Sequence, residues 1–187
     1  MDTKWKSNSM IVNLSKLVDF TTNHSQDAES AIQAWICTAY NLKAGELTQG
    51  YNPRFDFEVN DRRVELKISS KGTSDGIIEL MRDDYSPAGL SATKADVHAF
   101  LNPAGRGTAK LRLIKTSELI AFYFRNTKNR TLIPSAGNKR GSYMAPLDFK
   151  DHKDLMIGEC SYVNGEFDLG TMTTNTFAKQ NILKMFN

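Results

Sequence analysis

Asp56, Glu65 and Lys67 are the residues of this sequence whose types and spacing could do chemistry together. Polar and apolar residues alternate on both sides of the dipeptide Asn60-Asp61. This pattern predicts two strands joined by a two-residue hairpin turn. With that dipeptide as the turn, Asp56 lies directly opposite Glu65, and Lys67 follows two positions later on the same face. The sequence therefore predicts two carboxylates and an ammonium group on one face of a hairpin.

Opposed Cβ atoms of a hairpin lie about 4.5–5.5 Å apart, and two carboxylates this close both stay ionised only when a cation lies between them. Mg²⁺, with Mn²⁺ as a substitute, prefers oxygen ligands and keeps waters that a substrate phosphate can replace. The backbone carbonyl of Leu66 would supply a further oxygen. Lys67 would orient an attacking water, help to deprotonate it, or offset charge in a phosphoryl transition state. The spacing is that expected for metal-assisted phosphodiester hydrolysis.

Two other interpretations fit the same residues. The alternating charges are also typical of a solvent-exposed hairpin face with ordinary cross-strand ion pairs. In addition, Asn-Asp is a weaker hairpin turn than Asn-Gly, and a shifted register would put Glu58 in the place of Asp56.

The elements around the hairpin follow from periodicity. An apolar stripe predicts a helix over 24–42, with Ser25 as N-cap and with Glu29 in the first turn, at the border of the stripe. Apolar spacing over residues 1 to about 22 predicts another amphipathic helix. Strands are expected at 76–81, 96–101 and 110–115, a loop at 83–93, and a helix through 118–124. The pattern beyond 126 predicts no particular element.

The segment Asn52-Pro53-Arg54-Phe55-Asp56, followed by Val64-Glu65-Leu66-Lys67, resembles the signature of the PD-(D/E)XK nuclease superfamily. In that superfamily an acid begins one strand, an acid-x-lysine motif lies on its neighbour, and a preceding helix often contributes another acid. The resemblance extends loosely through 91–100 and covers about residues 24–125. One departure is that the Pro-Asp pair, adjacent in the family, is separated here by two residues.

The resemblance implies a single α/β domain with a restriction-endonuclease-like fold: a central mixed β-sheet flanked by helices, with a C-terminal elaboration over about 127–187. It implies that Asp56 and Glu65 bind the metal, that Lys67 is the catalytic lysine, and that Glu29 is the helix acid. The implied activity is divalent-metal-dependent cleavage of DNA, by a structure-specific or phage-type DNA-processing endonuclease. The alternative is a non-catalytic nucleic-acid-binding protein that retains the fold.

Several basic residues are candidates for DNA contacts, because phosphate contacts supply most nonspecific affinity. Lys71 follows the Glu-x-Lys motif, and Lys139 and Arg140 stand in a Gly/Asn/Ser-rich region. Solubility is the simpler explanation for any one of them. A homodimer is compatible with this activity, because cutting both strands of a duplex usually needs two active sites.

Three further residues could belong to such a site but have ordinary structural explanations. Asp96 precedes a strand, where an aspartate often caps a turn. Glu79 lies on an expected strand, where a solvent-facing acid is common. His98 alternates within an apolar strand and is expected to be a core residue, since no other histidine or cysteine stands at metal-ligand spacing.

Composition excludes several classes of protein. The chain has 187 residues, 40% of them hydrophobic, with 24 Lys and Arg against 21 Asp and Glu, for a net charge of +3. This balance is ordinary for a globular domain and permits a nucleic-acid partner. There is no apolar run long enough to span a membrane, no phosphate-cradling G-x-x-x-x-G-K-[ST] motif, and no continuous apolar core of a signal peptide. Because the chain has only two cysteines, a protein of a reducing, cytoplasmic compartment is expected. The missing phosphate-cradling motif predicts that the protein uses no nucleotide cofactor.

Overall fold

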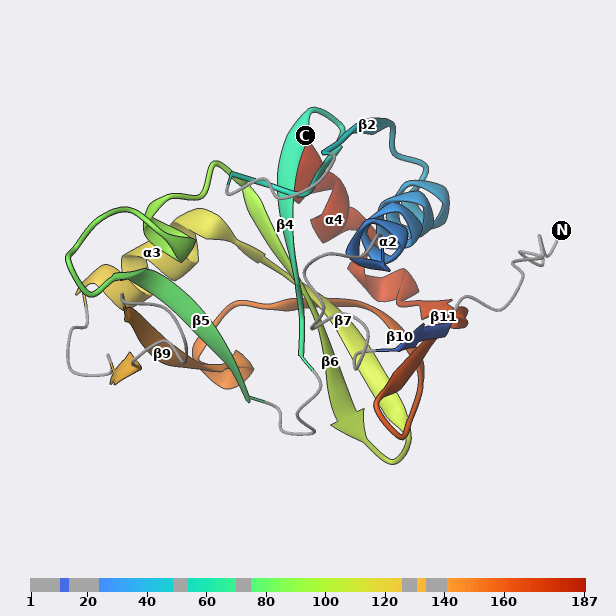
Figure 1. Ribbon diagram of the computed structural model, residues 1–187. Coiled ribbons are helices and arrows are strands. Elements are labelled where there is room, and N and C mark those ends of the chain that lie inside the picture. Colours follow the sequence, from blue (N-terminus) through green and yellow to red (C-terminus); the bar gives the residue numbers. More distant parts are fainter. Residues whose placement is uncertain (1–10, 14–23, 49–53, 70–74, 126–130, 134–140) are drawn as a thin grey trace, which may run out of the picture.

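The computed structural model describes residues 11–13, 24–48, 54–69, 75–125, 131–133 and 141–187. Its largest feature is a mixed sheet of eight strands in the order β1-β11-β10-β7-β6-β4-β3-β2. A second sheet has three strands in the order β5-β9-β8. In Figure 1, helices α2 and α4 lie on one side of the main sheet, and the small sheet and helix α3 lie on the other.

The strands of the main sheet are β1 (Ile11–Asn13), β2 (Ala44–Leu47), β3 (Phe57–Val59), β4 (Arg62–Ile68), β6 (Val97–Gly105), β7 (Thr108–Lys115), β10 (Leu155–Val163) and β11 (Glu166–Thr174). Those of the small sheet are β5 (Asp75–Arg82), β8 (Thr131–Ile133) and β9 (Ser142–Asp148). The helices are α2 (His24–Tyr40), α3 (Thr116–Arg125) and α4 (Lys179–Phe186).

The predicted hairpin is formed by β3 and β4. Asn60 and Asp61 have φ values of 50° and 60°. Positive φ at both central residues is the signature of a type I′ turn, whose twist matches that of the flanking strands. The register is confirmed for three pairs: Phe57 with Val64, Glu58 with Arg63, and Val59 with Arg62. Glu58 therefore does not take the place of Asp56.

Strand β4 is the central scaffold of the candidate site, because it pairs with β3 on one side and runs parallel to β6 on the other. Burial alternates along it as predicted: Val64 and Leu66 are buried, Glu65 is half-buried and Lys67 is exposed. The parallel register places Glu65 beside His98 and Lys67 beside Phe100.

Two hydrophobic cores cover the two faces of the main sheet. The first contains Ile32 and Ile36 of α2, Ile182 and Phe186 of α4, and the apolar side chains of β3 and β4. The second lies under the small sheet and α3, and it includes Phe100, Ile114, Leu80, Leu119 and Tyr123. The α/β prediction with a central mixed sheet is confirmed, with helices on one face and a helix with a small sheet on the other.

The N-terminal prediction is wrong where the structure describes it. Instead of belonging to a helix, Ile11–Asn13 form β1, which pairs antiparallel with Glu166–Asp168 of β11. Backbone pairing with an otherwise open sheet edge outweighs the local helical pattern. Residues 1–10 and 14–23 lie outside the described part. Helix α2 begins at His24, one residue before the predicted N-cap Ser25, and strand β2 was not expected.

The strands expected at 76–81, 96–101 and 110–115 are confirmed as β5, β6 and β7, and the helix at 118–124 is confirmed as α3. However, β5 does not join β3 and β4, because it pairs with β9 in the small sheet. The region after 127, expected as an elaboration, supplies β10, β11 and α4 to the main sheet and its core. No described helix is long and apolar enough to cross a membrane.

Gly158 of β10 marks a close approach between the sheet and α2. The pairing of β10 with β7 shifts register between Met156 and Gly158. A Cβ atom at Gly158 would lie 2.6 Å from Cη2 of Trp35 and 3.0 Å from the carbonyl oxygen of Thr173. Both distances are shorter than ordinary van der Waals separations, so any side chain here forces a neighbour to move.

We expect Gly158→Ala to lower the free energy of unfolding by about 1–3 kcal/mol, because it overpacks the space beside Trp35. Urea denaturation of the wild type, Gly158→Ala, Trp35→Leu and the double variant forms a complete cycle. In the double variant, removal of the indole ring should recover part of the stability. If the two substitutions changed the free energy of unfolding additively, this explanation would be contradicted.

Candidate active site

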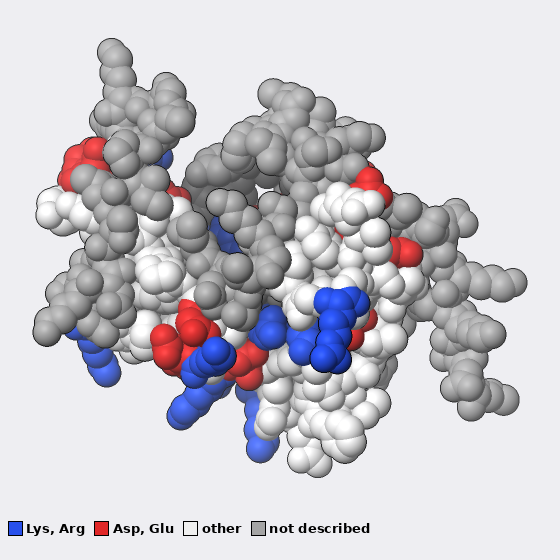
Figure 2. Space-filling model, turned by 90° about the horizontal axis from the view of Figure 1, so that it is seen from below, with Lys and Arg blue, Asp and Glu red and all other residues white. Residues whose placement is uncertain are grey.

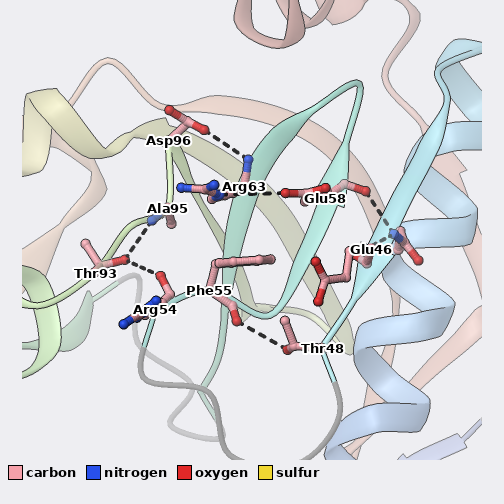
Figure 3. Close-up of polar contacts among 10 residues, drawn as sticks. Glu46, Thr48, Arg54, Phe55, Glu58, Arg63, Thr93, Ala95 and Asp96 are labelled. Atoms are coloured by element: carbon pink, nitrogen blue, oxygen red, sulfur yellow. Dashed lines mark hydrogen bonds and ion pairs between the residues drawn. The ribbon is translucent and has the colours of Figure 1, made fainter.

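Asp56 lies just before β3, in a backbone segment that hydrogen bonds hold from several directions. Its N–H donates to the carbonyl of Val64 at 2.9 Å. Its carbonyl accepts from both the N–H and the hydroxyl of Thr48, at 2.9 and 2.8 Å. Thr48 is 4% exposed, and its hydroxyl is also within 3.3 Å of the carbonyl oxygen of Phe55 (Figure 3). The backbone at Asp56 is therefore fixed before any ligand binds.

The residue two positions earlier is held in the same way. The carbonyl of Arg54 accepts from the N–H of Lys94 at 2.8 Å and from the hydroxyl of Thr93 at 3.2 Å. The hydroxyl of Thr93 in turn accepts from the N–H of Ala95 at 3.1 Å. Figure 3 shows Arg54, Thr93 and Ala95 on the side of the hairpin opposite Thr48.

Regular alternation predicted that Asp56 lies directly opposite Glu65, but the two residues do not form such a pair. The paired ladder ends at Phe57, and the N–H of Asp56 reaches Val64, one position short of Glu65. Phe55 also departs from regular alternation, which would place its side chain on the face opposite that of Arg63: the guanidinium of Arg63 lies 5.3 Å from the centre of its ring. An irregular strand end of this kind re-aims side chains.

The carboxylate of Asp56 is nevertheless directed at β4. Its Oδ2 accepts from the N–H of Leu66 at 2.6 Å. Because the N–H and C=O of one strand residue point to the same side of the strand, the carbonyl of Leu66 also lies on the β3 side of β4. The Asp56 carboxylate thus contacts the backbone of the residue whose carbonyl the sequence predicted as a metal ligand.

Glu65 and Lys67 form an ion pair on the same face of β4. Their side chains are 15% and 48% exposed. The pair engages one oxygen of Glu65 only, and Oε2 is buried without a hydrogen-bond partner in the described part of the chain. A buried carboxylate oxygen without a partner is unfavourable, and a cation or a donor on a ligand would satisfy it.

Glu29 comes to the same place from helix α2. It is half-buried, and its pKa is raised to about 7, mainly by burial and then by the charge of Glu65, while Lys67 acts in the opposite direction. The four predicted site residues, Glu29, Asp56, Glu65 and Lys67, therefore act on one another electrostatically, although they come from separate parts of the sequence.

The pKa of Asp56 is also raised to about 7. Burial is the main cause, followed by repulsion from Glu65 and Glu29, and the N–H of Leu66 and the charge of Lys67 only partly oppose them. For Lys67, burial acts to lower the pKa, but attraction to Glu65 and Asp56 outweighs burial, and the pKa is raised. Lys67 thus keeps its positive charge at neutral pH, inside a group of carboxyls whose mutual repulsion favours a cation.

These residues match the chemistry of a Mg²⁺ or Mn²⁺ site in donor type: two carboxylates, a carbonyl directed at one of them, and an unpartnered buried oxygen. Among the described residues, however, no three Asp, Glu, His or Cys side chains are already arranged as a metal-binding group. The Lys67 ammonium instead neutralises Glu65. A metal bound here would replace the ammonium group as the partner of Glu65.

Other candidates from the sequence have structural roles. Asp96 accepts from the N–H of Arg63 at 3.0 Å and so extends the edge of β4 (Figure 3). His98 is 2% exposed, its Nδ1 lies 2.8 Å from the hydroxyl of Thr116, and burial lowers its pKa to about 3, as expected for a core residue. Glu79 accepts from the hydroxyl of Ser142 at 2.7 Å and helps to raise the pKa of Lys67.

The predicted DNA-binding residues Lys71, Lys139 and Arg140 lie outside the described residues. Thr48 is the important residue that the sequence did not indicate. No local pattern marks it, because its role depends on β2 folding back beside the segment that contains Asp56.

Without a divalent metal, the protein should lose stability as pH rises from about 5 to 8. The ordinary pKa values of Asp56 and Glu29 are 3.8 and 4.5, and both are raised to about 7 in the folded protein. The folded state therefore binds these protons more tightly. The resulting stabilisation is complete below about pH 4 and is lost as pH rises through about 7. Each group contributes at most about 1.4 kcal/mol per pH unit.

Urea denaturation in EDTA across this pH range measures the effect. Asp56→Asn should flatten the profile, and millimolar Mg²⁺ should restore stability to the wild type at pH 8 but not to Asp56→Asn. A profile with the same slope in both proteins would show that Asp56 does not titrate in this way.

Thr48→Val should lower the free energy of unfolding by about 1–2 kcal/mol, because it removes the hydroxyl that donates to the Asp56 carbonyl while keeping the shape of the side chain. Thr48→Ser keeps the hydroxyl and should be destabilised less. Chemical denaturation of the three proteins makes the comparison. Greater destabilisation in Thr48→Ser than in Thr48→Val would mean that the methyl group, rather than the hydroxyl, matters.

Comparisons of this chain with protein-family models, with curated proteins and with solved structures find no match. An inference about function therefore depends on the geometry of Glu29, Asp56, Glu65 and Lys67, together with the resemblance of the Glu65-Leu66-Lys67 motif and its preceding acid to the PD-(D/E)XK signature.

Proposed function

We propose that this protein is a divalent-metal-dependent deoxyribonuclease that hydrolyses DNA phosphodiester bonds. The observation that carries the proposal is that Glu29, Asp56 and Lys67 lie close enough to Glu65 for their charges to interact, although they come from α2, the segment before β3, and β4. One buried oxygen of Glu65 also has no partner among the described residues. A surface hairpin with ordinary ion pairs would not require a second acidic segment and a helix acid beside it.

Mg²⁺, or Mn²⁺ in its place, would be held by Asp56, Glu65 and the Leu66 carbonyl. When bound, such an ion lowers the pKa of a water and withdraws charge from a phosphoryl oxygen. Glu29 adds negative charge around the donors and so favours the cation.

Lys67 has a more specific role in this proposal than the sequence alone gave it. The attraction of Glu65 and Asp56 keeps it protonated, which disfavours a role as a general base. Its ammonium group would instead donate hydrogen bonds to the attacking water or to the phosphate and offset the negative charge of the transition state.

The order of elements supports a restriction-endonuclease-like arrangement. An acid-bearing helix precedes the hairpin, the Glu-x-Lys motif lies on β4, and β4 has a parallel neighbour in β6. Within this class, the proposed enzyme is a structure-specific or phage-type DNA-processing endonuclease. A homodimer is part of this proposal where both strands of a duplex are cut.

A non-catalytic nucleic-acid-binding protein is the alternative. The ion pair between Glu65 and Lys67 favours it, because this pair neutralises the site without a metal. The buried acids argue against it, since carboxylates repel a polyanion and binding alone does not need them.

We expect Asp56→Ala and Lys67→Ala each to lower Mg²⁺-dependent DNA cleavage at least about 100-fold, because they remove a metal ligand and the charge that stabilises the transition state. Glu46→Ala and Lys43→Ala, in or next to β2, are matched controls that should keep full activity. Supercoiled plasmid, linear duplex, single-stranded DNA and a four-way junction, each with Mg²⁺, Mn²⁺ or EDTA, are the substrates.

Full activity in either site variant would exclude the proposed site. If the wild type cuts none of these substrates, calorimetry with Mn²⁺ separates the two functions. Metal binding that Asp56→Ala abolishes would support a nuclease of narrow specificity. DNA binding that is indifferent to metal would support the non-catalytic alternative.

A further inference from the structure

A concave feature lies where β4 begins. It is a hollow of about 400 Å³, formed where β4 and β6 begin, where β7 passes into α3, and where α4 ends. Four basic residues line it: Arg62, Lys94, Lys115 and Lys184. Asp96 is the one acidic residue of its lining. We refer to it as the basic hollow.

The charges of the basic hollow are largely uncompensated by described residues. Lys94, Lys115 and Lys184 are exposed and form no ion pair within the described part of the chain. Arg62 donates to a main-chain oxygen of Asn187 at 3.0 Å, so the three lysines supply the uncompensated charge. One oxygen of Asp96 is already engaged by the N–H of Arg63. Elsewhere, on the face shown in Figure 2, basic and acidic side chains are interspersed.

Four positive groups around one concavity repel one another, and a bound anion relieves that repulsion. The start of α3 adds to the effect, because the N-terminal end of a helix carries partial positive charge. Ser117, in the first turn of α3, is exposed and brings a hydroxyl to the same lining. Lysine ammonium groups, a guanidinium and a hydroxyl are the donors that recognise phosphate.

The position of the basic hollow relates it to the candidate site. Arg62 precedes Glu65 by three residues on β4, which corresponds to about 10 Å. A phosphate bound in the hollow would therefore belong to a nucleotide near the one at the candidate site. A backbone hydrogen bond also connects the hollow with the candidate site: the N–H of Lys94 donates to the carbonyl of Arg54, two residues before Asp56.

We propose that the basic hollow binds a backbone phosphate of a nucleic acid, a short distance from the phosphodiester at the candidate site. The distance rests on the proposed nuclease function, whereas phosphate binding by the hollow does not. Phosphate binding here would fix the position of the strand, and it would contribute affinity without reading sequence.

The test is DNA binding by a charge variant and by a matched control. Lys94→Gln, Lys115→Gln and Lys184→Gln are combined in one protein. Lys150→Gln, Lys153→Gln and Lys179→Gln, which remove the same charge from exposed positions outside the hollow, are combined in another. Fluorescence anisotropy with a short labelled duplex in EDTA, at several salt concentrations, gives Kd and its salt dependence. Circular dichroism and thermal unfolding verify that both proteins are folded.

We expect the hollow variant to bind at least tenfold more weakly, and the slope of log K against log salt to fall by about 0.9 for each phosphate that the variant no longer neutralises. The control should stay within about twofold of the wild type. Equal weakening in both proteins would overturn the proposal, because it would mean that net charge alone matters. Binding of inorganic phosphate or pyrophosphate without DNA binding would overturn the nucleic-acid assignment.

The same measurements separate this inference from the proposed function. Asp56→Ala should abolish cleavage but keep the duplex affinity measured in EDTA, whereas the hollow variant should bind the duplex more weakly. If the wild type binds DNA through the hollow but never cleaves, the phosphate site stands and the nuclease proposal fails.

Discussion

The arrangement of the site depends on where the backbone N–H and C=O groups of residues 54–56 find hydrogen-bond partners, because these residues lie outside the regular pairing of β3 with β4. Buried backbone groups need hydrogen-bond partners, and β3 does not extend far enough to supply them. Thr48, Thr93, Lys94 and Val64 provide them instead. As a result, the Asp56 carboxylate points across to the N–H of Leu66 rather than lying in a ladder position. The irregular end of the strand is what allows two acids on neighbouring strands to approach a common point without being a simple cross-strand pair.

This placement brings carboxyl groups close enough to repel one another, and the pKa values of the site residues show that repulsion. Three carboxyl groups share a partly buried region, and two of them, Glu29 and Asp56, hold their protons to about pH 7. Lys67 offsets part of the repulsion through its ion pair with Glu65. Sites that favour structural stability pair their buried charges fully, whereas this one leaves an oxygen of Glu65 without a partner among the described residues. Perturbed acids beside an unsatisfied oxygen are typical of functional sites, because structural stability alone gives no reason to keep them.

The sequence predicted those parts of the structure that local rules determine. The turn at Asn60-Asp61 forms because both residues tolerate positive φ, and burial alternates on β4 as expected. The gathering of Glu29 with the hairpin acids followed from a family resemblance rather than from local pattern. The errors arise where tertiary pairing decides the outcome. The segment 11–13 joins a sheet edge, β5 pairs with β9 in a different sheet, and the ladder breaks before Phe57. Thr48 was missed because its partners lie seven and eight residues away in a chain reversal that no motif marks.

The ion pair between Glu65 and Lys67 connects the two interpretations of the site. As a purely structural pair, half-exposed on the lysine side, it would contribute little stability, because exposed ion pairs are typically worth less than about 1 kcal/mol. The position of this ion pair beside Asp56 says more about the role of the site than the strength of the pair does. On the proposed function, Asp56 and Glu65 would hold a divalent cation that would neutralise Glu65 in place of Lys67, and the ammonium group of Lys67 would be available to a phosphate. The same lysine would then keep the acids compatible without a metal and stabilise developing charge when metal and DNA are present. On the proposed function, a single positive group with these two uses would let the site hold three carboxyls without a metal and still accept a polyanionic substrate.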